Sequence, residues 1–151
     1  MKLRTDDERF VIDTILENVE NEKEDTLFSH IDPGKIGLMG HSLGGSSLAQ
    51  LGRDRNDIDA VIVLDGTMLG EEVAYENNEI IFNDTPYHVP ILNVYVEDHY
   101  TNVMKLNGDA YDKFHASKNA VCAYETVFKN AGHLNFTDLP LFSPTLAKML
   151  V

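Results

Sequence analysis

The sequence predicts an α/β fold in which about four mostly parallel strands alternate with flanking helices. Two segments rich in apolar residues, Ile58 to Leu64 and Pro90 to Val96, are of strand length and are followed by acidic residues, as expected of buried parallel strands. A third apolar segment leads into a glycine-rich turn at Gly40 to Gly44, and helix-compatible residues follow at once. In an open sheet of this kind, functional side chains gather at the carboxyl ends of the strands.

Length and composition bound the domain organisation and the partners. The 151 residues, 43% of them hydrophobic, suffice for a real core, so residues 1–151 are expected to form a single domain. The formal charge of −13, from 25 acidic and 12 basic residues, argues against binding to nucleic acid or to an anionic membrane. No apolar run is long enough to span a bilayer and no leader pattern is found, which predicts a cytoplasmic protein without stable membrane insertion.

The first third of the chain is expected to form one helix and one strand. Thr5 and Glu8 have the spacing of a capping box, and apolar residues recur at helical intervals from Asp6 to about Val19. After a polar break, Asp32-Pro33-Gly34 predicts a turn and the run Lys35 to Met39 predicts a short strand. This strand leads directly into the glycine-rich turn.

The elements after the turn follow from the same patterns. Ser46 to Leu51 is expected to continue a helix that Gly52 ends. Between Met68 and His88 the pattern is weaker and leaves open a hairpin or a flexible lid. The remaining segments predict a helix from about Tyr100 to His115, a strand from Val121 to Phe128 and a closing helix from Pro144 to Leu150.

The glycine-rich turn is the strongest chemical signal in the sequence. A serine hydroxyl is a poor nucleophile unless a histidine accepts its proton and a carboxylate orients that histidine. The Gly-x-Ser-x-Gly pattern places Ser42 on a sharp turn between a strand and a helix, where Gly40 and Gly44 are expected to relieve backbone crowding. The amide of Leu43, at the start of the helix, is expected to stabilise a developing oxyanion. Ser42 is therefore the candidate nucleophile.

Candidate partners of Ser42 stand at the ends of the later strands. Asp65 directly follows one apolar strand, and His133 follows the last predicted strand. Glu97 and Asp98 follow the run that ends at Val96, and they are the alternative acids. The other histidines are expected to be surface or packing residues: His30, His41, His88, His99 and His115.

Three segments around these residues carry a family resemblance: Lys35 to Gly45, Val63 to Met68 and Gly132 to Asp138. Together they resemble the α/β-hydrolase superfamily, in particular its serine-dependent platelet-activating factor acetylhydrolase and dienelactone hydrolase branches. The resemblance covers nearly all of the chain and implies the order serine, acid, histidine along the sequence. It implies Ser42, Asp65 and His133 as a catalytic triad, and it favours Asp65 over Glu97 and Asp98.

The chain departs from that superfamily in its front half. A complete α/β-hydrolase has several strands before the one that leads into the nucleophile turn. The resemblance therefore implies a truncated fold without those N-terminal strands. The loop that usually supplies a second oxyanion donor is then missing too. The strand Lys35 to Met39 would be a bare apolar edge, which proteins usually cover. The expected cover is a homodimer partner or a complementary half of the fold.

The expected function is hydrolysis of carboxylic esters through an acyl-enzyme on Ser42. The substrate would be a small molecule with a short-chain or lipid-like acyl group, such as a phospholipid acetyl ester, and neither a metal nor an organic cofactor is required. A dienelactone hydrolase-like enzyme would carry cysteine in place of Ser42. The alternative is a catalytically weak or inactive fragment that acts as a binding or interaction module. The missing oxyanion loop favours that alternative, and the retained residue types oppose it.

Overall fold

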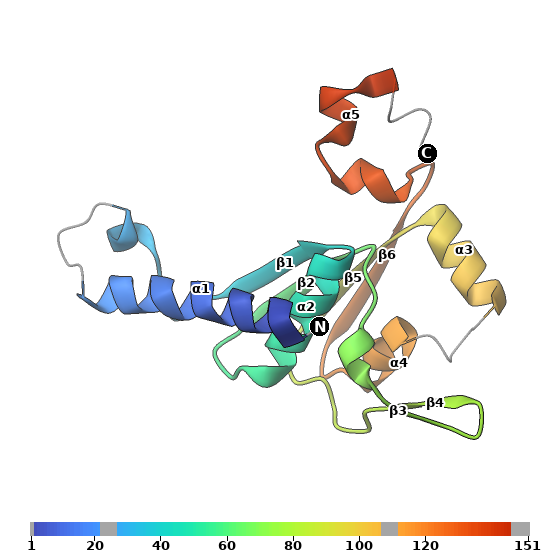
Figure 1. The fold of residues 1–151 in the computed structure, drawn as a ribbon, viewed down its shortest axis with the longest axis horizontal. Helices are drawn as coiled ribbons and strands as arrows, with labels where there is room; N and C mark the ends of the chain where they lie inside the picture. The colour runs from blue at the N-terminus through green and yellow to red at the C-terminus, as the bar shows by residue number, and fades with distance from the viewer. Residues whose placement is uncertain (1, 22–26, 107–111, 146–151) are drawn as a thin grey trace.

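A computed structural model describes residues 2–21, 27–106 and 112–145 of the chain. Four strands form one parallel sheet in the order β1-β2-β5-β6, which is also their order along the chain (Figure 1). These strands are β1 (Gly37–His41), β2 (Ala60–Leu64), β5 (Ile91–Val96) and β6 (Ala123–Phe128). The helices are α1 (Lys2–Asn21), α2 (Leu43–Asp54), α3 (Glu97–Leu106), α4 (Asp112–Asn119) and α5 (Leu139–Phe142). The predicted α/β fold with a parallel sheet is confirmed.

One face of the sheet is covered by helices and holds the core. Val61 of β2 and Ile91 of β5 share a buried cluster with Leu51 of α2 and Ala116 of α4. Tyr95, four residues after Ile91 and so on the same face of β5, belongs to a second buried cluster with residues of α3 and α4. Helices α2, α3 and α4 therefore pack on the same face of the sheet.

The opposite face of the sheet carries a row of apolar side chains in register. Met39 pairs with Ile62, Ile62 with Leu92, and Leu92 with Tyr124. Met39 and Tyr124, at the two ends of this row, are 64% and 65% exposed. Both faces of a parallel sheet are usually buried. The described part of the chain therefore leaves this apolar face only partly covered.

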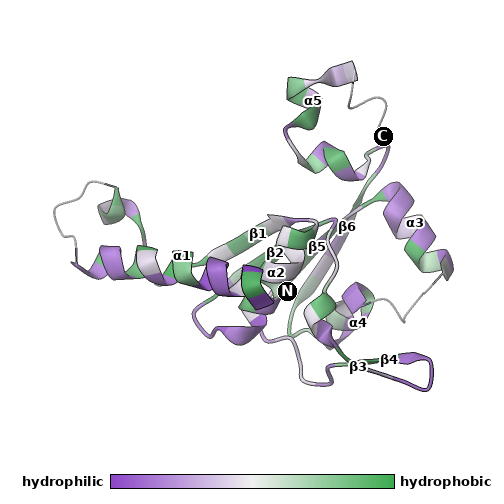
Figure 2. Cartoon of the chain, in the orientation of Figure 1, coloured by the Kyte–Doolittle hydropathy of each residue, from purple (hydrophilic) through white to green (hydrophobic). Residues whose placement is uncertain are grey.

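Helix α1 begins earlier than predicted. Because it starts at Lys2, Thr5 lies inside the helix and is buried there. Glu8 accepts a hydrogen bond from the hydroxyl of Ser47 in α2, at 2.5 Å. The capping-box prediction is wrong, because Glu8 joins the two helices instead of capping one. Hydrophilic and hydrophobic stretches alternate along α1 (Figure 2).

Helix α2 continues to Asp54, past the predicted end at Gly52. A Cβ atom at Gly52 would lie 2.7 Å from the hydroxyl of Tyr87 and 2.7 Å from a methyl group of Val61. The glycine therefore permits close packing of the helix on the sheet rather than ending the helix. Local sequence alone does not separate these two uses of glycine.

Other boundaries also differ from the predictions. Strand β1 spans Gly37–His41, two residues later than the predicted Lys35 to Met39. The helix predicted from Tyr100 to His115 corresponds to α3 and α4, with residues 107–111 between them outside the described part of the chain. The closing helix predicted from Pro144 to Leu150 lies mostly outside the described residues, which end at 145.

The segment between β2 and β5 forms a hairpin, one of the two predicted alternatives. It consists of β3 (Glu72–Glu76) and β4 (Glu79–Phe82), which pair antiparallel. Asn77 and Asn78 link them with φ angles of 51° and 67°, as two-residue hairpin turns favour. Figure 1 shows the hairpin extending away from the main sheet. Its base is tied to α2 by Arg53, whose guanidinium donates two hydrogen bonds of 2.6 Å to the buried carboxylate of Glu71.

Strand β1 lies at one edge of the sheet, and its outer side has no partner strand among the described residues. The amide of Ser42 donates to the carbonyl of Leu64 in β2. The carbonyl of Ile36 accepts from the amide of Asp59, on the same side. Backbone groups of successive residues in a strand point to opposite sides. Met39 therefore directs its amide and carbonyl toward the open edge.

We predict that this edge is covered in solution by a second copy of the chain, in a two-fold dimer that buries β1. An isologous contact would satisfy the outward backbone groups and shield the apolar edge with one self-complementary patch. Light scattering at micromolar concentration should give the mass of a dimer, and the amide of Met39 should exchange slowly with solvent. A stable monomer in which this amide exchanges rapidly would contradict the prediction. The amide of Leu38, which faces β2, is the internal control.

Candidate active site

Ser42 lies on a strained turn between β1 and α2. Its backbone angles are φ 55° and ψ −125°, a combination that residues with a side chain rarely adopt. Such a conformation costs on the order of 1–3 kcal/mol and persists only where the surrounding structure fixes it. Here the amide of Ser42 is held by the carbonyl of Leu64, and its carbonyl accepts the amide of Ser46 in the first turn of α2. The strand, turn and helix predicted around this serine are all present.

Three glycines permit this turn, and Gly40 is the one among them that the sequence motif predicts to relieve crowding. A Cβ at Gly40 would lie 2.6 Å from the carbonyl group of Gly44, and a Cβ at Gly45 would lie 2.6 Å from the oxygen of Gly40. A Cβ at Gly66, after β2, would collide with the carbonyl oxygen of Ser42. By contrast, a Cβ at Gly44 would meet open space. The prediction that Gly44 relieves crowding is wrong, because its Cβ direction points away from the strand.

The structure brings Ser42, His133 and Asp65 into one chain of hydrogen bonds. Nε2 of His133 lies 2.9 Å from Oγ of Ser42, and Nδ1 of His133 lies 2.6 Å from Oδ2 of Asp65. With its proton on Nδ1, His133 donates to the carboxylate and accepts from the serine hydroxyl. The three residues come from the carboxyl ends of β1 and β2 and from the short helix His133–Phe136 after β6. This geometry suits proton transfer from a serine nucleophile.

Asp65, rather than the alternative acids, contacts the histidine. Asp65 follows β2 with a φ of 46° and is 2% exposed. Glu97 and Asp98 form the first turn of α3, and the carboxylate of Glu97 accepts the amide of Asn130 at 3.2 Å. Among the described carboxylates, Asp65 is the one hydrogen bonded to the ring of His133.

The carboxyl group of Asp65 is held in its charged form. Burial alone would raise its pKa, but hydrogen bonds from His99, from His133 and from the amide of Val96 outweigh that effect, and the pKa lies well below its usual range. A folded-state pKa below the unfolded value means that this group stabilises the fold above the unfolded pKa. The contribution is lost as the pH falls toward the folded pKa.

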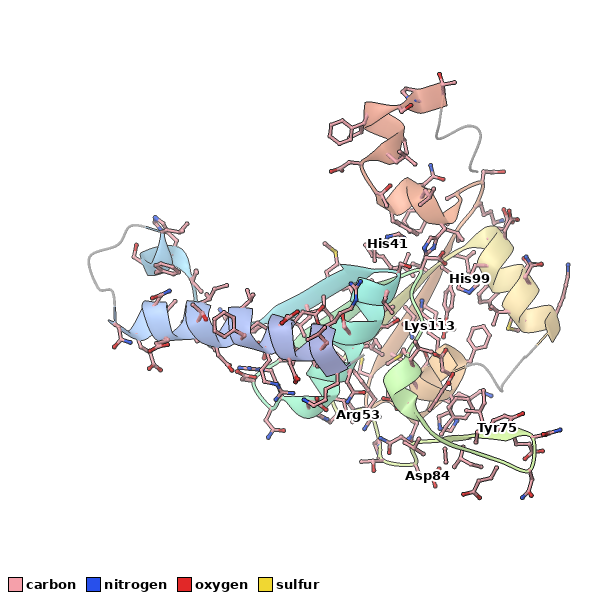
Figure 3. All side chains as sticks on the ribbon, viewed as in Figure 1. His41, Arg53, Tyr75, Asp84, His99 and Lys113 are labelled. Atoms are coloured by element: carbon pink, nitrogen blue, oxygen red, sulfur yellow. The ribbon has the colours of Figure 1, made fainter. Side chains whose placement is uncertain are left out.

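Two histidines near this chain of hydrogen bonds were expected to be surface or packing residues. His99 lies in the first turn of α3, and its Nδ1 is 3.0 Å from Oδ1 of Asp65. The ring of His41 lies 4.4 Å from the ring of His133, centroid to centroid, so it does not point away from the site. Both His41 and His99 lie at the same end of the sheet in Figure 3. The expectation is wrong for His99, which is hydrogen bonded to Asp65, whereas His41 is a packing residue, as expected.

His41 is packed as a neutral ring. Burial lowers its pKa, and the nearby ring of His133 lowers it further. Its Nε2 is buried without a hydrogen-bond partner among the described atoms. The ring of His41 packs against that of His133 at an interplanar angle of 42° and so supports it sterically.

The amide of Leu43 is a candidate donor to an oxyanion. Leu43 is the first residue of α2, and the first amides of a helix have no acceptor within the helix. The helix dipole adds a partial positive charge at the same place. Leu43 is the one such donor that the sequence motif and the described residues identify beside Ser42.

A buried lysine lies beneath the site. Lys113 of α4 is fully buried, its Nζ donates to the carbonyl of Val94 at 3.0 Å, and the same Nζ lies 4.0 Å from the centre of the Tyr95 ring. The amide of Asp65 donates to that same carbonyl. Burial lowers the pKa of Lys113 to about 8, against the opposite effect of Asp65 and Asp112.

Lys113→Met is expected to change how stability depends on pH. The unfolded chain binds more protons than the folded chain between about pH 8 and 10.5, so wild-type stability should rise with pH in that window, by roughly 3 kcal/mol at most. The methionine variant should lose this rise. Urea denaturation at a series of pH values measures it, with Lys105→Met, an exposed lysine of α3, as the control. An unchanged rise in Lys113→Met would contradict the assignment.

The described residues give no sign of two other kinds of site. No three His, Cys, Asp or Glu side chains in the described ranges cluster closely enough to hold a metal ion. Within the same ranges, no helix has the length and apolar character needed to cross a membrane.

Solved structures of esterases are among those that resemble the chain. A ferulic acid esterase from Streptomyces cinnamoneus gives a TM-score of 0.56 at 22% sequence identity, over 95% of this chain and 36% of the esterase. A carboxylesterase of the ammonia-oxidizing thaumarchaeon Nitrososphaera gargenis gives a TM-score of 0.43 at 11% identity, over 90% of this chain and 70% of that one. No protein-family model and no curated protein matches the sequence. The chain therefore shares its α/β fold with part of the ferulic acid esterase and spans about a third of that protein's length.

Proposed function

We propose that the protein hydrolyses carboxylic esters through an acyl-enzyme on Ser42. The observation that carries the proposal is the continuous chain of hydrogen bonds from Ser42 through His133 to Asp65. Each link is within hydrogen-bonding distance, and the strained turn presents the serine hydroxyl at the end of the sheet. The esterase-like fold supports the same reaction class.

His133 would accept and then donate a proton in each half of the reaction. In the first half, Oγ of Ser42 attacks the ester carbonyl carbon while Nε2 of His133 takes the hydroxyl proton. The negative oxygen that forms is stabilised by the amide of Leu43, and His133 then gives its proton to the departing alcohol. In the second half, water attacks the acyl-enzyme, again with His133 as base, and the acid and free Ser42 are released. Asp65 holds the ring orientation and stabilises its positive charge in both halves.

The substrate class proposed is an ester with a short-chain or lipid-like acyl group. The segments that resemble platelet-activating factor acetylhydrolases support acetyl esters, including those of phospholipids. The structural likeness to a ferulic acid esterase adds feruloyl esters to the set worth testing. A serine at position 42 is less consistent with a dienelactone hydrolase, which would carry cysteine there.

Among the described residues we identify one oxyanion donor, the amide of Leu43, and we therefore expect the rate of hydrolysis to depend strongly on the leaving group of the ester. Losing one of two donors typically costs on the order of 10²- to 10³-fold in rate, so esters that need little oxyanion stabilisation should react best. We expect p-nitrophenyl acetate to be cleaved at least about 100-fold faster, in kcat/KM, than ethyl acetate or methyl ferulate. Spectrophotometric and chromatographic assays of the purified chain measure both rates. Equal rates for activated and alkyl esters would show that a second donor is present.

A non-catalytic binding or interaction module is the second candidate. It is favoured by one observation, namely that the chain spans 36% of the esterase it resembles. In such a module Ser42 would be no more reactive than other serines. A fluorophosphonate probe, which labels activated serines, separates the two candidates even if turnover is slow.

A further inference from the structure

The carboxylate of Asp65 is held by two histidines, one on each oxygen. Nδ1 of His133 lies 2.6 Å from Oδ2, and Nδ1 of His99 lies 3.0 Å from Oδ1. The amide of Val96 also donates to Oδ1, at 3.0 Å. The proposed proton transfer from Ser42 uses His133, so it gives no role to His99.

His99 is fixed independently of the loop that carries His133. It lies in the first turn of α3, which begins one residue after β5 ends at Val96. Both donors to Oδ1 therefore come from the rigid junction between a central strand and a helix. With Oδ1 held there, Oδ2 of Asp65 is directed toward His133. The contacts to Oδ1 thus orient the acid from a different part of the chain than the contact to Oδ2.

The ring of His99 is also accessible to solvent protons. Its side chain is 31% exposed, whereas that of Asp65 is 1% exposed. The ring lines a cavity of about 690 Å³ whose other walls include Glu97, Asp98 and residues 130–133. Asp65 itself lines the same cavity, so the cavity adjoins both members of the His99–Asp65 contact.

We propose that His99 is a positioning residue for the hydrolysis, and that its protonation weakens the base His133. The inference rests on the proposed function. A neutral His99 with its proton on Nδ1 donates to Oδ1 and fixes the carboxylate. When His99 gains a second proton, a positive charge stands beside Asp65, and the charge that His133 must acquire in the reaction becomes less favourable. As the pH falls, activity is then lost through protonation of both His99 and His133 rather than of His133 alone.

Other charged groups near Asp65 and His99 belong to four elements: His41 at the end of β1, Lys113 on α4, Glu97 and Asp98 on α3, and His133 after β6. Burial lowers the pKa of His41, and it lowers the pKa of Lys113 to about 8. Histidine is the side chain that ordinarily changes charge near neutral pH, so the proposal concerns the two rings that share the carboxylate of Asp65.

Two variants of His99 test the proposal. His99→Asn keeps an amide donor near the position of Nδ1 but cannot become charged, and His99→Ala removes both properties. We expect His99→Ala to lower kcat for p-nitrophenyl acetate by about tenfold with little change in KM, and His99→Asn to restore most of kcat. In a plot of log kcat/KM against pH, the acidic limb should have a slope above one in the wild type and a slope of one in both variants. His88→Ala, whose ring contacts the carbonyl of Arg55, is the matched control and should behave as wild type.

A second measurement does not depend on turnover. Nitrogen-15 NMR of the imidazole rings follows the protonation of His133 directly, and its midpoint should move to higher pH in His99→Asn, because the neighbouring positive charge is gone. An unchanged kcat in His99→Ala, or an unchanged His133 midpoint in His99→Asn, overturns the proposal. If the wild type neither turns over nor reacts with phosphonate, the proposed hydrolysis fails, and the NMR midpoint still decides whether His99 acts on the Asp65–His133 pair.

Discussion

Ser42→Ala is expected to reduce ester hydrolysis by on the order of 10⁴-fold or more and to abolish labelling by a fluorophosphonate probe. The alanine lacks the Oγ that lies 2.9 Å from Nε2 of His133, so no covalent acyl-enzyme or phosphonyl adduct can form at this position. Intact-protein mass spectrometry after probe treatment should show one adduct in the wild type and none in the variant. Ser29→Ala, in the short helix Phe28–His30, is the matched control and should label as the wild type does.

Two results would count against this assignment. If Ser42→Ala is folded, by circular dichroism and urea denaturation, and still labels as fast as wild type, another serine is the reactive one. If the folded wild type does not label at all, the chain is better described as a binding or interaction module. The backbone strain at Ser42 does not differ between these cases, so reactivity rather than geometry decides between them.

Asp65→Asn is expected to lower kcat on the order of 10⁴-fold while leaving substrate binding nearly unchanged. An asparagine can turn its amide nitrogen toward Nδ1 of His133, and this favours the tautomer with its proton on Nε2. That tautomer cannot accept the proton of Ser42. The effect is measured as kcat and KM for p-nitrophenyl acetate, together with the rate of phosphonate labelling.

The controls for Asp65 are Glu97 and Asp98, the two acids that follow the neighbouring strand β5. Glu97→Gln and Asp98→Asn should each retain most of the wild-type kcat, because the carboxylate of Glu97 contacts the amide of Asn130 and neither acid is hydrogen bonded to His133 among the described contacts. A loss in either control as large as that in Asp65→Asn would mean that the acid has been assigned to the wrong strand.

The sequence was sufficient to predict the features that local patterns encode. The apolar run before Ser42 and the glycines around it predict a strand, a turn and a helix, and all three are found. Asp65 and His133 could be singled out because both directly follow predicted strands, whose carboxyl ends meet at one edge of a parallel sheet. The choice between Asp65 and Glu97 depended on a family resemblance, since both follow buried strands.

The features that were missed all depend on contacts between distant segments. Gly66 is needed because its Cβ would collide with the carbonyl of Ser42, 24 positions earlier in the chain. His99 was judged a surface residue, although it follows β5 within three residues and so lies at the same sheet edge as Asp65. Its position relative to that strand was the one available signal. Thr5 and Glu8 were misread because packing of α1 on α2, rather than local capping, uses Glu8.

Because β6 lies at the outer edge of the sheet, it is expected to detach from the sheet more easily than the central strands. His133 lies 91 residues after Ser42 in the sequence, in the segment that follows β6. Two residues of β6 itself, Tyr124 and Phe128, are 65% and 50% exposed. Edge elements with few buried contacts open with less free energy than the central strands. Detachment of β6 would separate His133 from Ser42 while β2 and β5 stay paired. Reactivity of the serine therefore reports on a local opening equilibrium and should disappear at lower denaturant concentration than the folded core.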